Sequence, residues 1–326
     1  MMNHRSKKII AADIGGTYSR LAAFEVISPQ DLDLIESITL ETGRFSTFDD
    51  LLDHCEESSL KRFLTQADII VIAVAGPVQS PDQSELTNLD WPINLKPAKN
   101  KYDKANFFLI NDFVAQAYGC LSRVGRGAKQ IKKGTLNYEG TIAVVGAGTG
   151  LGHCSLRSDS SQKYVHIPSE GGRMIFPFLG REELKFQQFV ISEVGLTQVT
   201  GDDILSGRGL SILHKYLTGR VLSPAEISRG ISQDSETAQW FSLFYGRSCR
   251  NYALAVLSLG GLFISGGLAG KNPYLVDCDA FRAEFTNSAT KGELLAGIPI
   301  FLIGDSGVGL WGAAIYGILK FQEKIF

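Results

Sequence analysis

The chain has 326 residues, 44% of them hydrophobic, which is enough to build one large domain or two medium ones. Its 32 basic and 34 acidic residues nearly balance, which argues against a surface for nucleic acid or an anionic membrane, and no run of 18 apolar residues predicts a transmembrane span. The cysteines are odd in number (five) and form no C-x-x-C pair, so we expect reduced packing residues rather than disulfides or a zinc site.

Short apolar runs alternate with helix-like segments along the chain. The runs stop at Gly, Asp or Asn and are typical of buried strands: KIIAAD, DIIVIAVAG, NFFLIND, TIAVVGAG, GLFISGG and IPIFLIGD. Residues 46–65 and 236–258 have helical patterns, and the final run GVGLWGAAIYGILKF predicts a helix that returns to the N-terminal part of the chain. This alternation predicts an α/β fold, in which ligands bind beyond the carboxyl ends of the strands.

One supersecondary pattern occurs twice, about 130 residues apart. IIAADIGGTYSRLAAF and TIAVVGAGTGLGHCSLR each contain a buried strand, a glycine corner with a Thr, and a second strand-like run. We therefore expect two related α/β lobes that face each other across a cleft.

The glycine corners have two interpretations. Each is either an ordinary tight hairpin or a loop whose backbone N–H groups approach a nucleotide phosphate closely, with Thr17 and Thr149 adding hydroxyl donors. Neither is a P-loop, because G-x-x-x-x-G-K-[ST] is absent from the sequence. Asp13, just before the first corner, would repel a phosphate unless Mg²⁺ lay between them, and this ion keeps much of its water. The repetition favours a nucleotide-phosphate site.

Polar residues at other strand ends suggest a sugar site. Asn111 and Asp112 end one strand and begin a helix, so they are either helix caps or, for Asp112, a general base for a substrate hydroxyl. Glu170 and Asp202 are either ordinary turn and cap residues or hydrogen-bond acceptors for a polyol. Gly266-Gly267 is either a tight turn or a place where the backbone approaches a ribose or a flat ring.

Taken in order, seven motifs resemble those of the bacterial glucokinase family, the non-ROK branch of the sugar kinase, actin and heat-shock chaperone ATPase superfamily. They are DIGGT, TNLDW, LINDF, GAGTGLG, PSEGG, ILSGRGL and GGLFISGGL, and the resemblance covers about residues 9 to 316. It implies two ribonuclease H-like (actin-like ATPase) lobes, a small one at 1–122 plus 306–326 and a large one at 123–305. It also implies a cytoplasmic enzyme that uses ATP and Mg²⁺ to phosphorylate the 6-hydroxyl of glucose, and it is compatible with a homodimer.

The resemblance implies a role for each matched residue. Asp112 matches the catalytic base, which also contacts the sugar. The other sugar-binding positions are Asn88, Asn111, Glu170, Arg173 and Asp202. The ATP-binding positions are Asp13, Gly15, Gly16, Thr17, Gly148, Thr149, Gly150, Gly266 and Gly267, with Asp13 reaching the metal through water.

Two positions depart from the family pattern, both on the sugar side. Arg173 stands where the family usually has His, and Asp202 stands where it has Glu. Arg is always charged and only donates hydrogen bonds, whereas neutral His also accepts them. A kinase for another hexose, for an amino sugar or for a sugar with an anionic or N-acyl substituent therefore remains an alternative. A non-catalytic sugar-binding regulator and an actin-like or chaperone-like ATPase are the alternatives from other classes.

Overall fold

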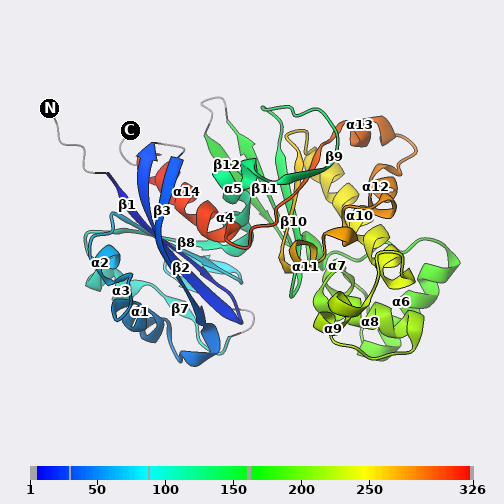
Figure 1. Cartoon of the computed structure of the whole chain (residues 1–326), viewed down its shortest axis with the longest axis horizontal. Helices are drawn as coiled ribbons and strands as arrows, with labels where there is room; N and C mark the ends of the chain where they lie inside the picture. The colour runs from blue at the N-terminus through cyan, green and yellow to red at the C-terminus, as the bar shows by residue number, and fades with distance from the viewer. Residues whose placement is uncertain (1–5, 29–30, 87–88, 160–162, 324–326) are drawn as a thin grey trace. The chain divides into compact units, whose positions relative to one another are not determined.

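The structure is a computed structural model that describes residues 6–28, 31–86, 89–159 and 163–323. The chain divides into two compact units, Met1–Gly127 with Gly307–Phe326, and Ala128–Ser306. Each unit has a sheet of its own and is described separately below (Figure 1).

The first unit is built on a sheet with the strand order β3-β2-β1-β4-β8. Its strands are β1 (Lys8–Ile14), β2 (Tyr18–Ser28), β3 (Asp31–Glu41), β4 (Ile69–Val74) and β8 (Asn106–Asn111), and a small separate sheet contains β5 (Val78–Ser80), β6 (Gln83–Ser84) and β7 (Ile93–Asn94). Its helices are α1 (Phe48–Glu56), α2 (Lys61–Leu64), α3 (Lys96–Lys101), α4 (Asp112–Gly119), α5 (Arg123–Arg126) and α14 (Val308–Glu323), with a 3₁₀ turn at Thr42–Arg44.

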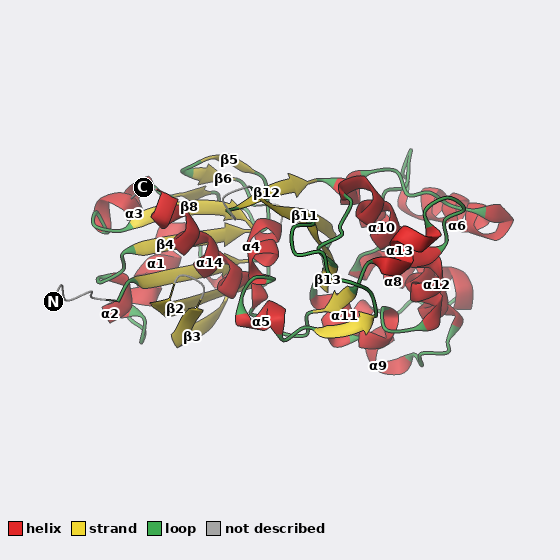
Figure 2. Ribbon diagram, turned by 90° about the horizontal axis from the view of Figure 1, so that it is seen from above, coloured by secondary structure: helices red, strands yellow, loops and turns green. Residues whose placement is uncertain are grey.

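Both faces of this sheet are covered, which explains why β1 and β4 are continuous apolar runs rather than alternating ones. On one face, Ile10 and Ile14 of β1 are buried in a cluster with Leu52 of α1. On the other face, α14 lies over the sheet (Figure 2), and its Gly317 packs against the side chains of Ile69 and its neighbours.

The C-terminal helix also packs tightly on α4. A Cβ atom added at Gly312 of α14 would lie 1.7 Å from the carbonyl oxygen of Ala115, and one added at Gly119 would lie 2.5 Å from the carbonyl oxygen of Val308. The backbones of the two helices therefore touch where no side chain intervenes. The prediction that the final helix returns to the N-terminal part of the chain is confirmed.

The second unit repeats the topology of the first. Its sheet has the order β12-β11-β10-β13-β14-β9, from strands β9 (Lys129–Lys132), β10 (Ile142–Ala147), β11 (Leu151–Ser158), β12 (Tyr164–Ser169), β13 (Leu262–Ser265) and β14 (Ile300–Leu302). In each sheet a glycine-cornered hairpin extends into a third antiparallel strand, and its first strand pairs in parallel with a later one. The predicted use of one supersecondary unit twice is confirmed.

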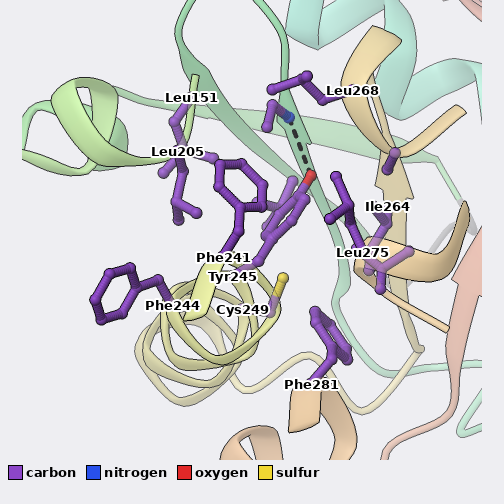
Figure 3. Close-up of a cluster of buried hydrophobic side chains, with 14 of the residues drawn as sticks. Leu151, Leu205, Phe241, Phe244, Tyr245, Cys249, Ile264, Leu268, Leu275 and Phe281 are labelled. Atoms are coloured by element: carbon purple, nitrogen blue, oxygen red, sulfur yellow. Dashed lines mark hydrogen bonds between the residues drawn. The ribbon is translucent and has the colours of Figure 1, made fainter. Parts of the chain in front are cut away.

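Helices make up most of the rest of the second unit. They are α6 (Gly180–Val194), α7 (Gly201–Ile204), α8 (Gly207–Thr218), α9 (Pro224–Gly230), α10 (Glu236–Val256), α11 (Gly267–Lys271), α12 (Asp279–Thr286) and α13 (Gly292–Gly297), with 3₁₀ turns at Gly171–Arg173 and Pro273–Leu275. The core lies between the sheet and α10, whose Phe241, Tyr245 and Cys249 are fully buried (Figure 3).

A buried ion-pair network joins three of these helices. Arg247 of α10 has a side chain only 2% exposed, and it forms salt bridges with Glu183 of α6 and Glu284 of α12. The Arg247 guanidinium also donates to the carbonyl oxygen of Pro177 at 2.9 Å, and Arg250 donates to Glu284 at 2.8 Å. Because the buried guanidinium has several acceptors around it, the network fixes how these helices are oriented.

The cysteines act as packing residues, as the sequence predicted. All five are buried and unbridged. Burial raises the pKa of the Cys55 thiol to about 12, so that it stays protonated at neutral pH.

Candidate active site

The first glycine corner joins β1 to β2. The N–H of Gly15 donates to the carbonyl oxygen of Tyr18 at 3.0 Å, and a Cβ added at Gly15 would lie 3.2 Å from that same oxygen. A larger residue at Gly15 would therefore crowd this carbonyl oxygen. Thr17 at the tip is exposed, so that its hydroxyl is available to a ligand.

Thr42, at the end of β3, holds this corner from outside. Its hydroxyl donates to the carbonyl oxygen of Gly15 at 2.8 Å, and its N–H donates to the carbonyl oxygen of Thr17 at 3.0 Å. A further hydrogen bond links its hydroxyl to that of Ser19 at 2.9 Å, and Thr42 is fully buried. With its carbonyls engaged, the corner has a defined backbone conformation. Thr42 could not be predicted from the sequence, because a lone Thr after an exposed strand carries no pattern.

Asp13 lies at the end of β1, directly opposite Arg20 of β2 in the antiparallel register. The Arg20 guanidinium is 3.7 Å from the Asp13 carboxylate. Burial raises the pKa of the Asp13 carboxyl above its usual range, and the charge of Arg20 opposes this shift. Gly309, in the first turn of α14, leaves room for the acid: a Cβ there would lie 3.0 Å from an Asp13 oxygen.

Asn111 and Asp112 lie where β8 ends and α4 begins. Asn111 does cap the helix: its side-chain oxygen accepts from the N–H of Phe113 at 2.9 Å, and its amide nitrogen donates to the carbonyl oxygen of Gly76 at 3.1 Å. Each of these two amide atoms retains capacity for one more hydrogen bond, so capping does not exclude a sugar contact.

Asp112 is the first residue of α4. Its pKa is raised to about 7, chiefly by burial and then by the negative charge of Asp13. The N–H of Phe113, which donates to Asp112 Oδ1 at 3.0 Å, lowers the pKa and only partly offsets this rise. The two acids come together because β1, β4 and β8 are parallel neighbours and end at the same edge of the sheet.

The second glycine corner, Gly148–Gly150, joins β10 to β11 in the second unit. The N–H of Gly148 donates to the carbonyl oxygen of Gly150 at 2.8 Å, and the N–H of Gly207 donates to the carbonyl oxygen of Gly148 at 2.9 Å. These contacts do not use the N–H groups of Thr149 and Gly150, and consecutive backbone N–H groups in such a turn can bind an anion.

The segment Glu170–Arg173, here called the EGGR turn, follows β12. The Arg173 side chain donates to the Glu170 carboxylate at 3.2 Å, and both side chains are largely exposed, at 65% and 77%. The Arg that replaces the family's usual His is thus paired with the acid beside it, and both groups are accessible to a ligand.

Asp202 is held between these two segments. Its Oδ1 accepts from the N–H of Leu151 at 2.6 Å, and the same oxygen would lie 2.7 Å from a Cβ added at Gly172. The neighbouring Asp203 is the capping acid of α7, which accepts from the N–H of Thr200 at 2.9 Å. Of the two adjacent acids, Asp203 therefore caps and Asp202 contacts the second glycine corner.

Gly266 and Gly267 connect β13 to α11. Gly266 has a φ of +89°, which favours glycine, and a Cβ there would lie 2.7 Å from the carbonyl oxygen of Ala147, the last residue of β10. The two glycines form a tight turn that lies against the end of the second glycine corner. A Cβ at Gly267 would meet nothing within 4 Å, so this side of the turn is open.

The structure thus gathers most of the predicted residues into one set in each unit. Asp13, Asn111, Asp112 and the first corner share an edge of the first sheet, whereas the second corner, the EGGR turn, Asp202 and Gly266 cluster in the second unit. Asn88 lies outside the described residues.

The carboxylates of the first unit suit a hydrated cation better than a cage of protein ligands. Within the described ranges, no group of three or more His, Cys, Asp or Glu side chains is arranged to hold a metal ion. Asp13 and Asp112 are half-buried acids with raised pKa values, and the charge of Asp13 contributes to the shift of Asp112. A divalent cation with its own water shell would favour their ionised forms. None of the described helices is long and apolar enough to cross a membrane.

Comparison with known proteins identifies the family. A sequence profile for the family described as Glucokinase matches residues 10–319. The chain belongs to the glucokinase family. A curated glucokinase from Nostoc sp. (strain PCC 7120) is 31% identical over an alignment 346 positions long, and the alignment covers 94% of this chain and 98% of the relative.

Solved structures of sugar kinases have the same fold. A glucokinase from an Antarctic psychrotroph matches with a TM-score of 0.82 and 26% identity, over 95% of this chain and 98% of that one. A ROK family glucokinase from Streptomyces griseus, in complex with glucose and AMPPNP, matches with a TM-score of 0.63 and 18% identity, over 95% and 99% of the two chains. These matches confirm three predictions: the glucokinase family, the α/β actin-like ATPase fold, and an enzyme of the glucokinase class that phosphorylates a sugar.

Proposed function

We propose that this member of the glucokinase family transfers the terminal phosphoryl group of ATP to the 6-hydroxyl of glucose, with Asp112 as the general base. The observation that carries the proposal is the place of Asp112, which begins α4 directly after β8, at the carboxyl edge of the sheet where ligands of α/β proteins bind. Its pKa, raised to about 7, supports the role. A base works best when its pKa lies near the working pH. The S. griseus glucokinase of the same fold, which binds glucose and AMPPNP, supports these two substrates.

In this reaction the Asp112 carboxylate accepts the proton of the sugar hydroxyl while the hydroxyl oxygen attacks the terminal phosphorus. A P–O bond forms, the bond between that phosphorus and the bridging oxygen breaks, and ADP leaves with the electron pair. Phosphoryl transfer depends mainly on position and charge stabilisation. The glycine corners would bind the phosphates through backbone N–H groups, aided by Thr17 and Thr149.

Asp13 would hold Mg²⁺ through water. When bound, the cation neutralises charge on the transferred phosphate. The raised pKa of Asp13 and the nearby carboxyl of Asp112 support this role, because both acids are buried near each other and a cation favours their ionised forms. Arg20, 3.7 Å from Asp13, would keep the carboxylate oriented beneath the first corner.

On the sugar side, Asn111 would use its remaining donor and acceptor, and Glu170 would accept from sugar hydroxyls. Because Glu170 is paired with Arg173, sugar binding would compete with or rearrange this ion pair. Gly266 and Gly267 would let the adenosine of ATP approach the backbone closely. Asn88 would add a sugar contact, as the family resemblance implies.

A coupled spectrophotometric assay with ATP, Mg²⁺ and a panel of hexoses and amino sugars tests the proposal. We expect glucose to give the highest kcat/KM, and Asp112→Ala to abolish turnover while calorimetry still detects sugar binding. No turnover with any sugar, or unchanged turnover in Asp112→Ala, would refute it. A protein that binds sugar but shows no turnover in its native form would instead be the non-catalytic regulator.

One observation favours a second substrate class. Arg173 is 65% exposed and always charged, which suits an anionic or N-acyl substituent better than the neutral hydroxyl of glucose. The same assay with Arg173→His separates the two. A preference for a substituted sugar that the variant loses would support the second class, and a clear wild-type preference for glucose would exclude it.

A further inference from the structure

The second glycine corner is held at both ends by side chains from outside the hairpin. Ala147 and Leu151 face each other across β10 and β11, at the two ends of the corner. Their N–H groups donate to side chains of other elements: Ala147 to the hydroxyl of Tyr245 at 3.0 Å, and Leu151 to Oδ1 of Asp202 at 2.6 Å. The conformation of the corner therefore depends on both of these side chains.

Tyr245 is anchored in the core. It is fully buried on α10 and packs edge-on against the rings of Phe241 and Phe281, with centroids 6.2 and 6.1 Å away. Its hydroxyl accepts the hydrogen bond from the N–H of Ala147, which Figure 3 marks with a dashed line among apolar side chains. Because those rings cannot move without disturbing the packing, the hydroxyl is a fixed acceptor for the start of the corner.

Asp202 packs closely against glycines of the corner and of the EGGR turn, and the residue before it is also a glycine. A Cβ added at Gly150 of the corner would lie 3.1 Å from Asp202 Oδ1, and one added at Gly172 of the EGGR turn would lie 2.7 Å from it. A Cβ added at Gly201, the residue before Asp202, would lie 2.9 Å from the carbonyl oxygen of Gly172. These close approaches leave no space between the corner, the EGGR turn and the start of α7.

The start of α7 is also tied to the chain that leaves the EGGR turn. The N–H of Gly201 donates to the carbonyl oxygen of Met174 at 3.1 Å, and Ile175 forms an isolated β-bridge with Thr200. A displacement of the EGGR turn must therefore move Asp202, and with it the N–H of Leu151 at the end of the corner.

We propose that Tyr245 and Asp202 are positioning residues for the phosphate-binding corner, and that Asp202 couples this corner to the EGGR turn. Asp202 then acts mainly on nucleotide binding. Because coupling between two sites is reciprocal, it also makes the nucleotide and sugar affinities depend on each other. This inference rests on the proposed function for the identity of the ligands. It assigns to Asp202 a role that a plain sugar ligand would not have.

The test measures the affinity for AMPPNP with Mg²⁺ by calorimetry, in the absence of sugar, for the wild-type protein and four variants. Asp202→Ala removes the acceptor of the Leu151 N–H, and we expect it to weaken AMPPNP binding by roughly tenfold. Asp202→Asn keeps an acceptor oxygen and should stay within about threefold of wild type. Tyr245→Phe, which removes only one oxygen, should weaken binding by roughly fivefold.

Asp203→Ala is the matched control, because it removes the adjacent carboxylate, which caps α7 and does not contact the corner. It should bind AMPPNP within about twofold of wild type, since an N-cap change acts mainly on stability. In wild type we further expect glucose to change AMPPNP affinity, and in Asp202→Ala we expect this effect to shrink toward none.

Two results would overturn the inference. The first is AMPPNP affinity in Asp202→Ala that equals that of wild type while sugar affinity falls, because Asp202 would then be a plain sugar ligand. The second is unchanged AMPPNP affinity in Tyr245→Phe, and this variant decides the matter if Asp202→Ala fails to fold. A wild-type protein that binds AMPPNP but phosphorylates no sugar refutes only the proposed function, whereas one that binds no AMPPNP refutes both.

Discussion

Replacing Asp112 with Asn should abolish turnover and at the same time stabilise the protein. Asn has nearly the same shape as Asp, and its oxygen can still accept the N–H of Phe113. It cannot accept the proton of a sugar hydroxyl, so we expect kcat to fall by about 10² to 10⁴. The gain in stability follows from the pKa of about 7, which shows that the ionised carboxylate is unfavourable in the folded protein.

The size of the stability gain follows from the difference between the Asp112 pKa of about 7 in the folded protein and its ordinary pKa of 3.8. At about 1.36 kcal/mol for each pKa unit this difference corresponds to about 4 kcal/mol, and we expect about 2 to 4 kcal/mol because residual exposure screens the charge. Since the folded pKa is the higher one, the stability contributed by the acid is fully present below about pH 4 and is lost as the pH rises to about 7. Asp112→Asn should therefore gain most above pH 7 and nothing near pH 4.

Thermal unfolding of wild type and Asp112→Asn at pH 8, 5 and 4 measures this difference. At pH 8 we expect the melting temperature of the variant to be higher by about 4 to 10 °C. Asp103→Asn, which changes an exposed carboxylate in the same unit, serves as the control and should leave it unchanged. A variant that is less stable than wild type at pH 8, or a gain that is the same at every pH, would refute the reasoning.

Three further predictions concern the elements that hold the site. Thr42→Val removes the hydroxyl that fixes the first glycine corner and should raise KM for ATP by roughly tenfold, with a smaller change in kcat. Steady-state kinetics measure this beside the control Thr39→Val, which changes an exposed residue of β3, and equal KM values for the two variants would contradict the prediction. Gly312→Ala places a Cβ 1.7 Å from a carbonyl oxygen of α4 and should destabilise the protein by about 3 kcal/mol or more. Gly43→Ala is the control, because a Cβ there has open space, and equal melting temperatures for the two variants would refute the tight contact of α4 with α14. Arg247→Met leaves the Glu183 carboxylate without its guanidinium partner and leaves Glu284 paired with Arg250 alone. It should cost about 3 kcal/mol in urea unfolding, and a loss below about 1 kcal/mol would show that the network does not hold the helices.

Much of the fold could be predicted from the sequence because its central strands are buried on both faces. All the apolar runs that predicted strands are strands in the structure, as β1, β4, β8, β10, β13 and β14. The exposed edge strand β3 was missed because its solvent-facing residues give no apolar run. The single helix predicted at 46–65 is interrupted between α1 and α2, where the Ser58 hydroxyl donates to the carbonyl oxygen of Cys55 and accepts from the N–H of Leu60, thereby competing with the helical pattern.

The candidate site was predictable to a different degree in each part. Strand-end acids such as Asp13 and Asp112 could be placed, since parallel strands bring their carboxyl ends to one edge. The residues that position the glycine corners could not. The hydroxyl groups of Thr42 and Tyr245 each bond to a backbone group far away in sequence, and such contacts leave no periodic or spacing signal. The choice between cap and ligand for Asp202 also required the structure, because only there does its oxygen meet the N–H of Leu151.

The most direct test of the central claim is the distance from the Asp112 carboxylate to the sugar's 6-hydroxyl in a crystal structure of the protein with glucose and AMPPNP. We predict that one carboxylate oxygen lies about 2.6 to 3.2 Å from that hydroxyl oxygen. A carboxylate that lies beyond hydrogen-bond distance of every sugar hydroxyl, with another side chain facing the 6-hydroxyl, would contradict the account.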